Sequence, residues 1–482
     1  MQYKWTALTV TTVGTLMVGI DARILVIGLP TVAKQLHTGA AEVIWISQAF
    51  ILATSVCLLL VGRIADLFGR VRLYALGFTV FTIGSALCAI AFDSYQLIAF
   101  RVLQGVGAAM IVANSVAIIT DASPRNELGM LLSINQTAFR VGNVAGLTVS
   151  GLILSVVDWR GLFYVNIPIG IFGTLWAHRR LKEISTKDTS KKMDWLGFGL
   201  FSSSLALILL AITFLSYGVG ALLYGYALLI AGFALLALFV WVEARSRIPL
   251  MDLHLFRKRS FAVGNFTQLI NSIAWAGFLL LIAFYLQIGL GYSPFQAGIS
   301  VVPLEIVYMV SSIVCGRLSD RYGSRLLTTL GLSIVTTGFV IVSTFGSSTT
   351  YYEIVLVLIF IGVGNGMYTS PNTRSIMTSV PPHRRGVAAG FRETMFNTGV
   401  ATSYGLVILF ITFGIPYGLF SPLLDGSIAP PLIETAKSQF YNGFRIATLV
   451  LGAIDAIAIV PSALRETREK QSVEELKKRG EN

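Results

Sequence analysis

The stretch GRIADLFG at residues 62–69 returns as GRLSDRYG at residues 316–323, 254 positions later. Each copy lies between two long apolar segments. Further along, the pattern Gly-Val-Gly with a following Met at residues 105–110 returns at 362–367, 257 positions later. A nearly constant offset over this length is typical of a duplicated unit. The sequence therefore predicts two homologous halves, each with six membrane-spanning segments.

The composition excludes a soluble globular protein. Hydrophobic residues make up 55% of the 482 residues, charged residues make up 12%, and the mean hydropathy is +0.75. Apolar runs of about twenty residues recur along the chain, and each can cross about 30 Å of hydrocarbon. The pattern predicts an all-α integral membrane protein with fourteen transmembrane helices. They are expected near residues 6–30, 43–62, 72–92, 96–120, 128–154, 162–178, 195–215, 223–242, 261–288, 296–316, 326–345, 353–374, 386–413 and 441–464.

The distribution of basic residues indicates the topology. The formal net charge is +12, but no basic stripe with interleaved aromatic residues suggests a nucleic-acid partner. If the N-terminus is cytoplasmic, the cytoplasmic loops and ends hold 27 Lys and Arg residues and the outer loops hold only 3. Because basic residues accumulate in cytoplasmic loops, we expect a multi-pass protein of the plasma membrane with both termini in the cytoplasm. The three cysteines lie inside apolar spans without the spacing of a disulfide framework or metal site.

Several motifs resemble those of the major facilitator superfamily, and in particular its fourteen-helix drug:proton antiporter branch. The repeated glycine-rich stretch is similar to the family's loop motif between helices two and three, and residues 101–107 are similar to its fourth-helix motif. Branch signatures are matched within 159–170, 194–197 and 243–256. The resemblance implies the major facilitator fold: two pseudo-symmetric six-helix bundles with two extra central helices.

The repeat and the predicted spans together give the expected domain boundaries. These are an N-terminal six-helix bundle at 1–181, linkers with the two extra helices at 182–260, a C-terminal six-helix bundle at 261–465, and a charged cytoplasmic tail at 466–482. One departure from the branch lies at residues 146–151, where GLTVSG keeps the outer glycines of the antiporter motif but has no proline. A helix without a kink is expected there.

We interpret both copies of the loop motif as a conformational latch on the cytoplasmic side. The glycines allow a tight turn, and the acidic residues can form charge-assisted contacts at helix ends with nearby arginines. An ordinary loop that only sets topology is the alternative. The latch residues expected are Gly62, Asp66, Gly69, Arg70, Gly316, Asp320 and Gly323.

Charged residues inside spans are costly in a bilayer and mark candidate functional sites. Asp21, Arg140 and Glu305 lie near the middle of their spans, and the family fold implies that their helices line one central cavity. Asp21 occupies the branch's carboxylate position and is predicted to carry a proton; a fixed ion pair with Arg140 or Arg23 is the alternative. The full set of expected proton-coupling residues is Asp21, Arg101, Gln104 and Glu305.

The repeat also suggests residues that contact substrate. Residues 135 and 140 correspond to Arg392 and Asn397, so each half offers one Arg and one Asn at exchanged levels. Pairing of Arg392 with its own neighbours is the alternative. The predicted substrate-binding residues are Arg140, Asn143, Arg392, Glu393, Asn397 and Trp275. Asp455 has no assigned role.

The residues favour a secondary transporter over an enzyme, because no nucleophile–base pair, phosphate loop or metal-ligand cluster is present. The leading hypothesis is proton-coupled efflux of amphiphilic drugs or related small molecules by alternating access. A carrier of an organic anion is the alternative, because inward arginines create a positive field. The expected partners are a small-molecule substrate, protons and the lipid bilayer. No cofactor or metal is expected beyond the proton gradient, and the chain is expected to be monomeric.

Overall fold

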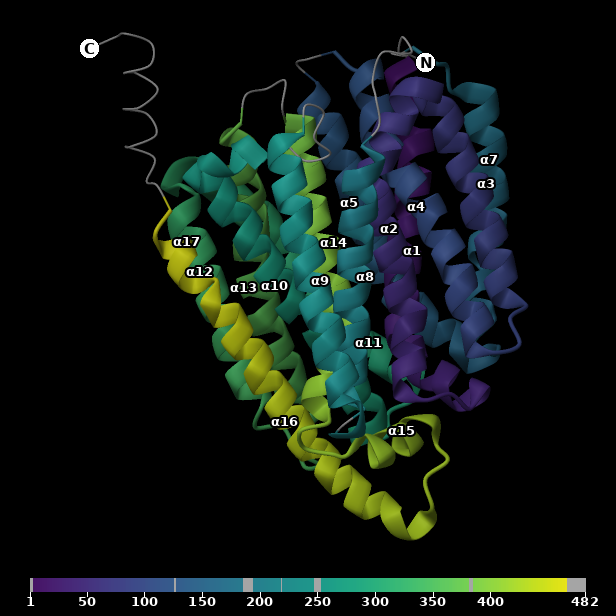
Figure 1. Cartoon of the computed structure of the whole chain (residues 1–482), viewed down its shortest axis with the longest axis vertical. Helices are drawn as coiled ribbons and strands as arrows, with labels where there is room; N and C mark the ends of the chain where they lie inside the picture. The colour runs from purple at the N-terminus through teal and green to yellow at the C-terminus, as the bar shows by residue number, and fades with distance from the viewer. Residues whose placement is uncertain are drawn as a thin grey trace. The chain divides into compact units, whose positions relative to one another are not determined.

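The computed structural model describes residues 3–124, 127–184, 194–217, 219–246, 253–380 and 385–465, and within these ranges every regular element is helical (Figure 1). The first half contains α1 (Tyr3–Leu36), α2 (Ala40–Phe68), α3 (Arg70–Ala89), α4 (Ser94–Ala122), α5 (Leu128–Val156), α6 (Gly161–Tyr164) and α7 (Asn166–Arg180). Two further long helices follow, α8 (Trp195–Ser216) and α9 (Leu222–Arg245). The second half contains α10 (Arg259–Phe284), α11 (Pro294–Tyr322), α12 (Ser324–Val342), α13 (Tyr351–Thr378), α14 (Arg385–Ile411), α15 (Tyr417–Asp425), α16 (Ile433–Ile457) and α17 (Ile459–Ala463).

The predicted all-α membrane architecture is confirmed. Among the described residues, 13 helices are long and apolar enough to cross a membrane. The predicted span at 162–178 is formed by α6 and α7, which together run from Gly161 to Arg180 and are separated by Val165. In α5 no proline occurs, and the helix is continuous from Leu128 to Val156.

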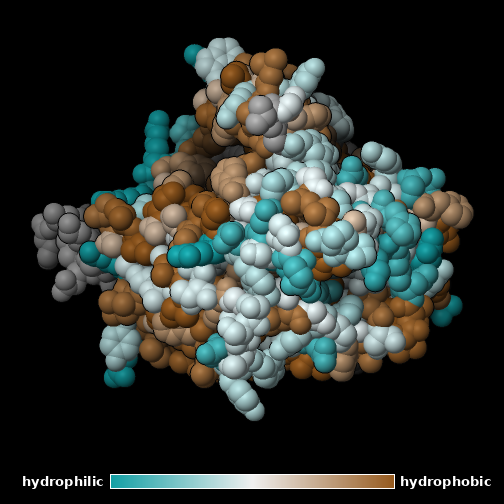
Figure 2. Space-filling model, turned by 90° about the horizontal axis from the view of Figure 1, so that it is seen from below, coloured by the Kyte–Doolittle hydropathy of each residue, from teal (hydrophilic) through white to brown (hydrophobic). Residues whose placement is uncertain are grey.

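Burial separates helices that face lipid from helices that face protein. The most apolar stretch of α9 has a mean hydropathy of 2.3, yet only 17% of it is buried inside the protein. The span Arg259–Gly289, which contains α10, has a lower mean hydropathy of 2.0 but is 83% buried. Exposed apolar side chains on α9 include Leu223 and Ile230. Such a surface is stable only in contact with lipid. Figure 2 shows a different face of the molecule, seen from below. Hydrophilic residues occupy much of this lower face, and hydrophobic residues lie along its margin.

The first compact unit consists of the described residues of Met1–Leu250, Leu279–Val302 and Tyr404–Gly443. Its helices run side by side, and α1 packs closely on α5 (Figure 1). A Cβ atom added at Gly19 would lie 2.5 Å from the backbone oxygen of Phe139, and one added at Gly146 would lie 2.5 Å from that of Ile20. Glycine on both helices therefore allows the two backbones to touch.

The unit also includes outer parts of the second half. Gln287 donates a hydrogen bond to the backbone oxygen of Ile27 at 3.0 Å, and a Cβ on Gly298 would lie 2.8 Å from the backbone oxygen of Leu147. Helix α15 caps α2, because the Tyr417 hydroxyl accepts the Ala41 amide at 3.2 Å. These units reflect contacts between helices, whereas the predicted domain boundaries follow the sequence repeat and stay a prediction.

The second unit consists of the described residues of Met251–Phe278, Pro303–Ser403 and Phe444–Asn482. Its glycines repeat the packing of the first. A Cβ on Gly105 of α4 would lie 2.5 Å from the backbone oxygen of Phe50 on α2, and one on Gly362 of α13 would lie 2.6 Å from that of Leu304 on α11. The 257-residue offset seen in the sequence thus corresponds to equivalent helix contacts.

Candidate functional site

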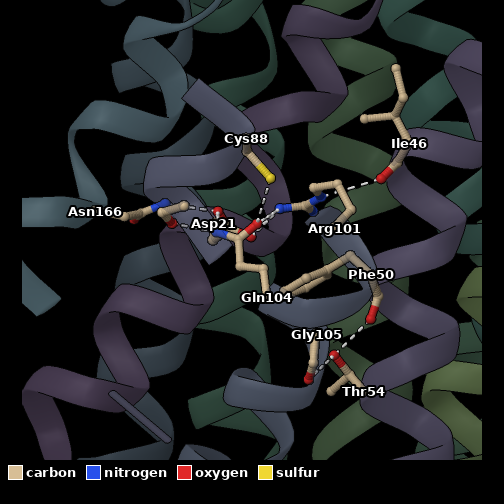
Figure 3. Close-up of polar contacts among 10 residues, drawn as sticks. Asp21, Ile46, Phe50, Thr54, Cys88, Arg101, Gln104, Gly105 and Asn166 are labelled. Carbon is tan, nitrogen blue, oxygen red and sulfur yellow. Dashed lines mark hydrogen bonds and ion pairs between the residues drawn. The ribbon is translucent and has the colours of Figure 1, made fainter. Parts of the chain in front are cut away.

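A buried polar cluster, which we call the Asp21 cluster, joins four helices of the first unit (Figure 3). Asp21 on α1 accepts hydrogen bonds from Arg101 at 2.7 Å, from Gln104 at 2.9 Å and from Asn166 at 2.8 Å. Both arginine and glutamine come from α4, and Asn166 begins α7. Gln104 also donates to Ser85 of α3 at 2.6 Å. One carboxylate therefore holds α1 to α4 and α7 directly, and to α3 through Gln104.

The charges of this cluster are removed from water. The exposed fraction of the side chain is 0% for Asp21 and 2% for Arg101. The arginine is further held by the backbone oxygen of Ile46 at 3.2 Å and by the ring of Phe50, 4.1 Å from its guanidinium carbon. A buried ion pair of this kind is retained only when further hydrogen bonds satisfy its remaining polar atoms. Loss of either charge would leave the other without compensation.

Close contacts of α4 with a glycine of α3 and a threonine of α2 place Gln104 in this cluster. Gly84 on α3 faces it so closely that an added Cβ would lie 2.8 Å from the Gln104 Cα atom. On the other side, the Thr54 hydroxyl of α2 donates to the backbone oxygen of Gly105 at 3.1 Å. The motif thus brings α4 between α2 and α3, so that its two polar side chains reach α1.

The structure brings together three of the four predicted proton-coupling residues, but with a different ion pair. The sequence offered Arg140 or Arg23 as the fixed partner of Asp21, whereas the structure pairs Asp21 with Arg101. Arg23 instead lies beside the Tyr404 hydroxyl. The reason is the rotation of α1, which directs Asp21 toward α4 rather than toward α5. Asn166, a further ligand of the carboxylate, was part of a matched signature but had no predicted role.

On α5, the two predicted substrate-binding residues Arg140 and Asn143 are both half-buried. The Asn143 side-chain oxygen is enclosed and has no hydrogen-bond partner within the part of the chain that the structure describes. Because α5 packs on α1 through glycine contacts, these residues are fixed to the same pair of helices as Asp21.

The other predicted site residues lie in the second unit. Arg392 and Glu393 form an ion pair with each other at 2.7 Å, as the alternative for Arg392 proposed. Glu305 is buried, with 4% of its surface exposed, and Asn397 is half-buried. The Trp275 ring is buried against the Tyr308 ring, with their centroids 5.5 Å apart. The Trp275 ring is thus enclosed by protein, while the charge of Arg392 is balanced locally.

The latch around Gly69 has partners that the sequence did not indicate. Arg70 forms an ion pair with Asp121 of α4 at 2.6 Å, and the Glu183 carboxylate accepts the Arg70 and Val71 amides at 3.1 and 3.0 Å. These amides begin α3, where a carboxylate is favoured by the helix dipole. The first latch therefore connects α3 to the end of α4 and to the chain after α7.

Both turns of the latch require glycine. The φ angle is 106° at Gly69 and 77° at Gly323, a region that other residues rarely adopt. In the second latch, Arg374 of α13 donates to the backbone oxygen of Ser319 on α11. Gly316 packs on Ser370. Gly62 and the side chains of Asp66 and Asp320 lie outside what the structure describes, so their predicted contacts stay predictions.

Comparisons with known proteins agree with this architecture. The model of the family described as Major Facilitator Superfamily matches residues 11–404. The riboflavin transporter RibZ of Clostridioides difficile is 31% identical over 86% of this chain and 90% of its own. The multidrug efflux pump LfrA of Mycolicibacterium smegmatis is 27% identical over 96% of both chains. Among solved structures, a bacterial homolog of the human lysosomal transporter Spinster, inward-facing and occupied, has a TM-score of 0.70 and 16% identity over 96% of this chain and 97% of that chain.

Proposed function

The chain belongs to the major facilitator superfamily, and on that premise we propose that it exports amphiphilic small molecules across the plasma membrane in exchange for protons. It is a multi-pass membrane transport protein and not an enzyme. The proton coupling, the substrate class, the fourteen-helix antiporter branch and the cytoplasmic position of both termini form the proposal. The observation that carries it is the buried ion pair between Asp21 and Arg101.

In the proposed mechanism, protonation of Asp21 switches off its attraction to Arg101. The ionised carboxylate accepts three hydrogen bonds from two other helices. A proton on Asp21 removes its charge, so the attraction to Arg101 is lost and at least one donor must find another acceptor. The contacts of α1 with α4 and α7 then weaken. A substrate that competes for Arg101 or Gln104 would be coupled to the same event.

The helix packing indicates which parts move together. Gly19 and Gly146 hold α1 and α5 in backbone contact, and Gly105 holds α4 against α2. We therefore propose that the pair α1 and α5 shifts against α4 and α7 when Asp21 is protonated. Such a shift between rigidly packed helices is the ordinary basis of alternating access in transporters.

An amphiphilic substrate is favoured over an organic anion by the local charge balance. Of the arginines that suggested an anion, Arg101 is paired with Asp21 and Arg392 with Glu393. The positive field is therefore smaller than the sequence alone suggested. The name of one relative, a riboflavin transporter, supports a substrate with aromatic rings, and that of another, a multidrug efflux pump, supports export of drugs. The half-buried Tyr308 ring, which packs on Trp275, offers matching surface.

Transport in proteoliposomes tests the proposal, with ethidium as a lipophilic cation and fluorescein as an organic anion. We expect ethidium to accumulate in vesicles with an acidic interior, and the accumulation to stop when a proton–potassium exchanging ionophore collapses the gradient. Protein-free vesicles provide the control. Equal ethidium entry with and without the gradient would contradict proton coupling, and gradient-driven movement of fluorescein alone would support the organic-anion alternative.

A further inference from the structure

Another buried carboxylate, which the proposed mechanism does not use, lies in the second unit. Asp455 on α16 is 0% exposed. One oxygen of its carboxylate accepts a hydrogen bond from Asn271 of α10 at 3.2 Å, and the other accepts one from Thr336 of α12 at 3.0 Å. We call these three residues the Asp455 cluster. Its three helices belong to the first, third and last predicted spans of the second half.

The same three helices of the first half contribute to the Asp21 cluster, with the acid and the amide exchanged. There the carboxylate is on the first helix and Asn166 is on the last. In the second half Asn271 is on the first helix and Asp455 is on the last. A hydroxyl of the third helix takes part in both clusters. The two clusters therefore lie on equivalent helices of the two halves, at positions about one turn apart on the first and third helices, and use the same types of polar group.

The fourth helix makes the difference between them. At the 257-residue offset, Arg101 corresponds to Leu358 and Gln104 corresponds to Ile361, and both apolar residues are fully buried. The glycines that follow them, Gly105 and Gly362, make equivalent helix contacts, which fixes this correspondence. The second half has thus replaced the cation and its neighbouring amide by hydrocarbon.

Among the described residues, Asp455 has only neutral hydrogen-bond partners. Within the part of the chain that the structure describes, no Lys, Arg or His forms an ion pair with its carboxylate. Three other charged or titratable groups of this unit make hydrogen bonds or ion pairs elsewhere. The Tyr368 hydroxyl donates to Thr267 at 3.1 Å, the Arg465 guanidinium donates to the same hydroxyl oxygen at 2.7 Å, and Arg392 is paired with its neighbour.

An ionised carboxylate buried with two neutral donors and no cation is costly, and a bound proton removes that cost. We propose that Asp455 is a second proton-binding site of this transporter, formed by the counterpart of the Asp21 cluster. The proton comes from water, bonds to a carboxylate oxygen and returns to water; no other bond changes. Its use in transport rests on the proposed function, but its occupancy does not.

Infrared spectroscopy of the purified protein, with the spectrum of each variant subtracted from that of the wild type, tests this site without a transport substrate. A protonated carboxyl group has a C=O stretching band that an ionised one lacks. We expect the wild-type protein at neutral pH to show such a band, and Asp455→Asn to lose it. The matched control is Asp21→Asn, which should keep the band because the Asp21 charge is balanced by Arg101. Thr336→Val should keep the band but shift its frequency, since one hydrogen bond to the carboxyl group is lost.

Three outcomes would overturn the proposal. A band of full size in Asp455→Asn would mean that it arises from another group. Absence of the band in the folded wild-type protein, in buffer with choline as the only cation, would mean that Asp455 is ionised. A band that appears only after sodium is replaced by choline would assign a sodium ion to the cluster. Thermal melts and the Thr336→Val spectrum guard against a variant that fails to fold. If the band behaves as expected while ethidium movement ignores the pH gradient, the proposed function fails and the proton site stands.

Discussion

The Asp21 and Asp455 clusters show two ways in which one duplicated framework keeps a carboxylate inside a membrane protein. In the first unit Asp21 is neutralised by Arg101 on the fourth helix, and in the second unit that position is Leu358. Binding of a proton breaks an ion pair, because it neutralises the carboxylate. A carboxyl group among neutral donors, in contrast, is most stable with its proton bound. The duplication thus provides two different acidic sites from one arrangement of helices.

The largest expected effect, on both stability and transport, comes from removing the negative charge of Asp21. Asp21→Asn leaves the Arg101 guanidinium buried without a counter-ion, and breaking a buried pair in this way costs about 3–5 kcal/mol of stability. We expect a clear fall in melting temperature. Ethidium accumulation driven by a pH gradient should be abolished, while exchange of ethidium at equal pH should persist. Gradient-driven accumulation at the wild-type rate would show that Asp21 is not the coupling site.

The double variant Asp21→Asn with Arg101→Met is the control for this interpretation. Since both charges are absent, most of the lost stability should return. Coupling should remain absent, because the switch has been removed. Failure of the double variant to recover stability would mean that the loss comes from the hydrogen bonds of Asn166 and Gln104 rather than from the unbalanced arginine.

Arg140 provides the next test, because the repeat replaces it by Asn397 in the second half. Arg140→Gln makes the first half resemble the second. If an organic anion binds there, its affinity should fall by about 1.5–3 kcal/mol, more than tenfold. The proposed function instead expects unchanged affinities for both ethidium and fluorescein, measured by fluorescence titration. Unchanged fluorescein affinity would remove the organic-anion alternative.

The two latches differ in the space beside their turning glycines. A Cβ on Gly69 would lie 2.6 Å from the Glu183 carboxylate, whereas nothing lies within 4 Å of one on Gly323. Both substitutions strain a positive φ angle, at about 1–3 kcal/mol each. We expect Gly69→Ala to be the more harmful, and both to lower turnover more than substrate affinity. Equal melting temperatures for the two variants would argue against the Glu183 contact.

The sequence predicted the helices and singled out Asp21, Arg101 and Gln104, which the structure brings together, because intramembrane charge and motif spacing are visible along one chain. It did not predict which arginine pairs with Asp21. Three arginines lie in nearby spans, and the choice depends on the rotation of α1 between α4 and α5, which hydropathy does not determine.

The role of Asp455 was hidden from the sequence for a similar physical reason. Its hydrogen-bond donors are neutral and lie 184 and 119 residues away. Asn and Thr inside an apolar span are common and carry no charge signal. Only the packing of α10, α12 and α16 shows that these ordinary side chains surround a carboxylate, and that Leu358 stands where the first half has an arginine.

The smallest expected effect is the sharpest test of the difference between the clusters. Asp455→Asn keeps the shape of the side chain and one oxygen that accepts a hydrogen bond, and its NH2 group takes the place of the carboxyl OH as a donor to the Thr336 hydroxyl. If the carboxyl group already holds a proton, the change replaces one neutral group by another, and stability should change by less than about 1 kcal/mol. Melting curves of Asp455→Asn and Asp21→Asn in the same detergent give the comparison directly. A loss as large as that of Asp21→Asn would mean that Asp455 is ionised and balanced by a cation, and the contrast between the two halves would disappear.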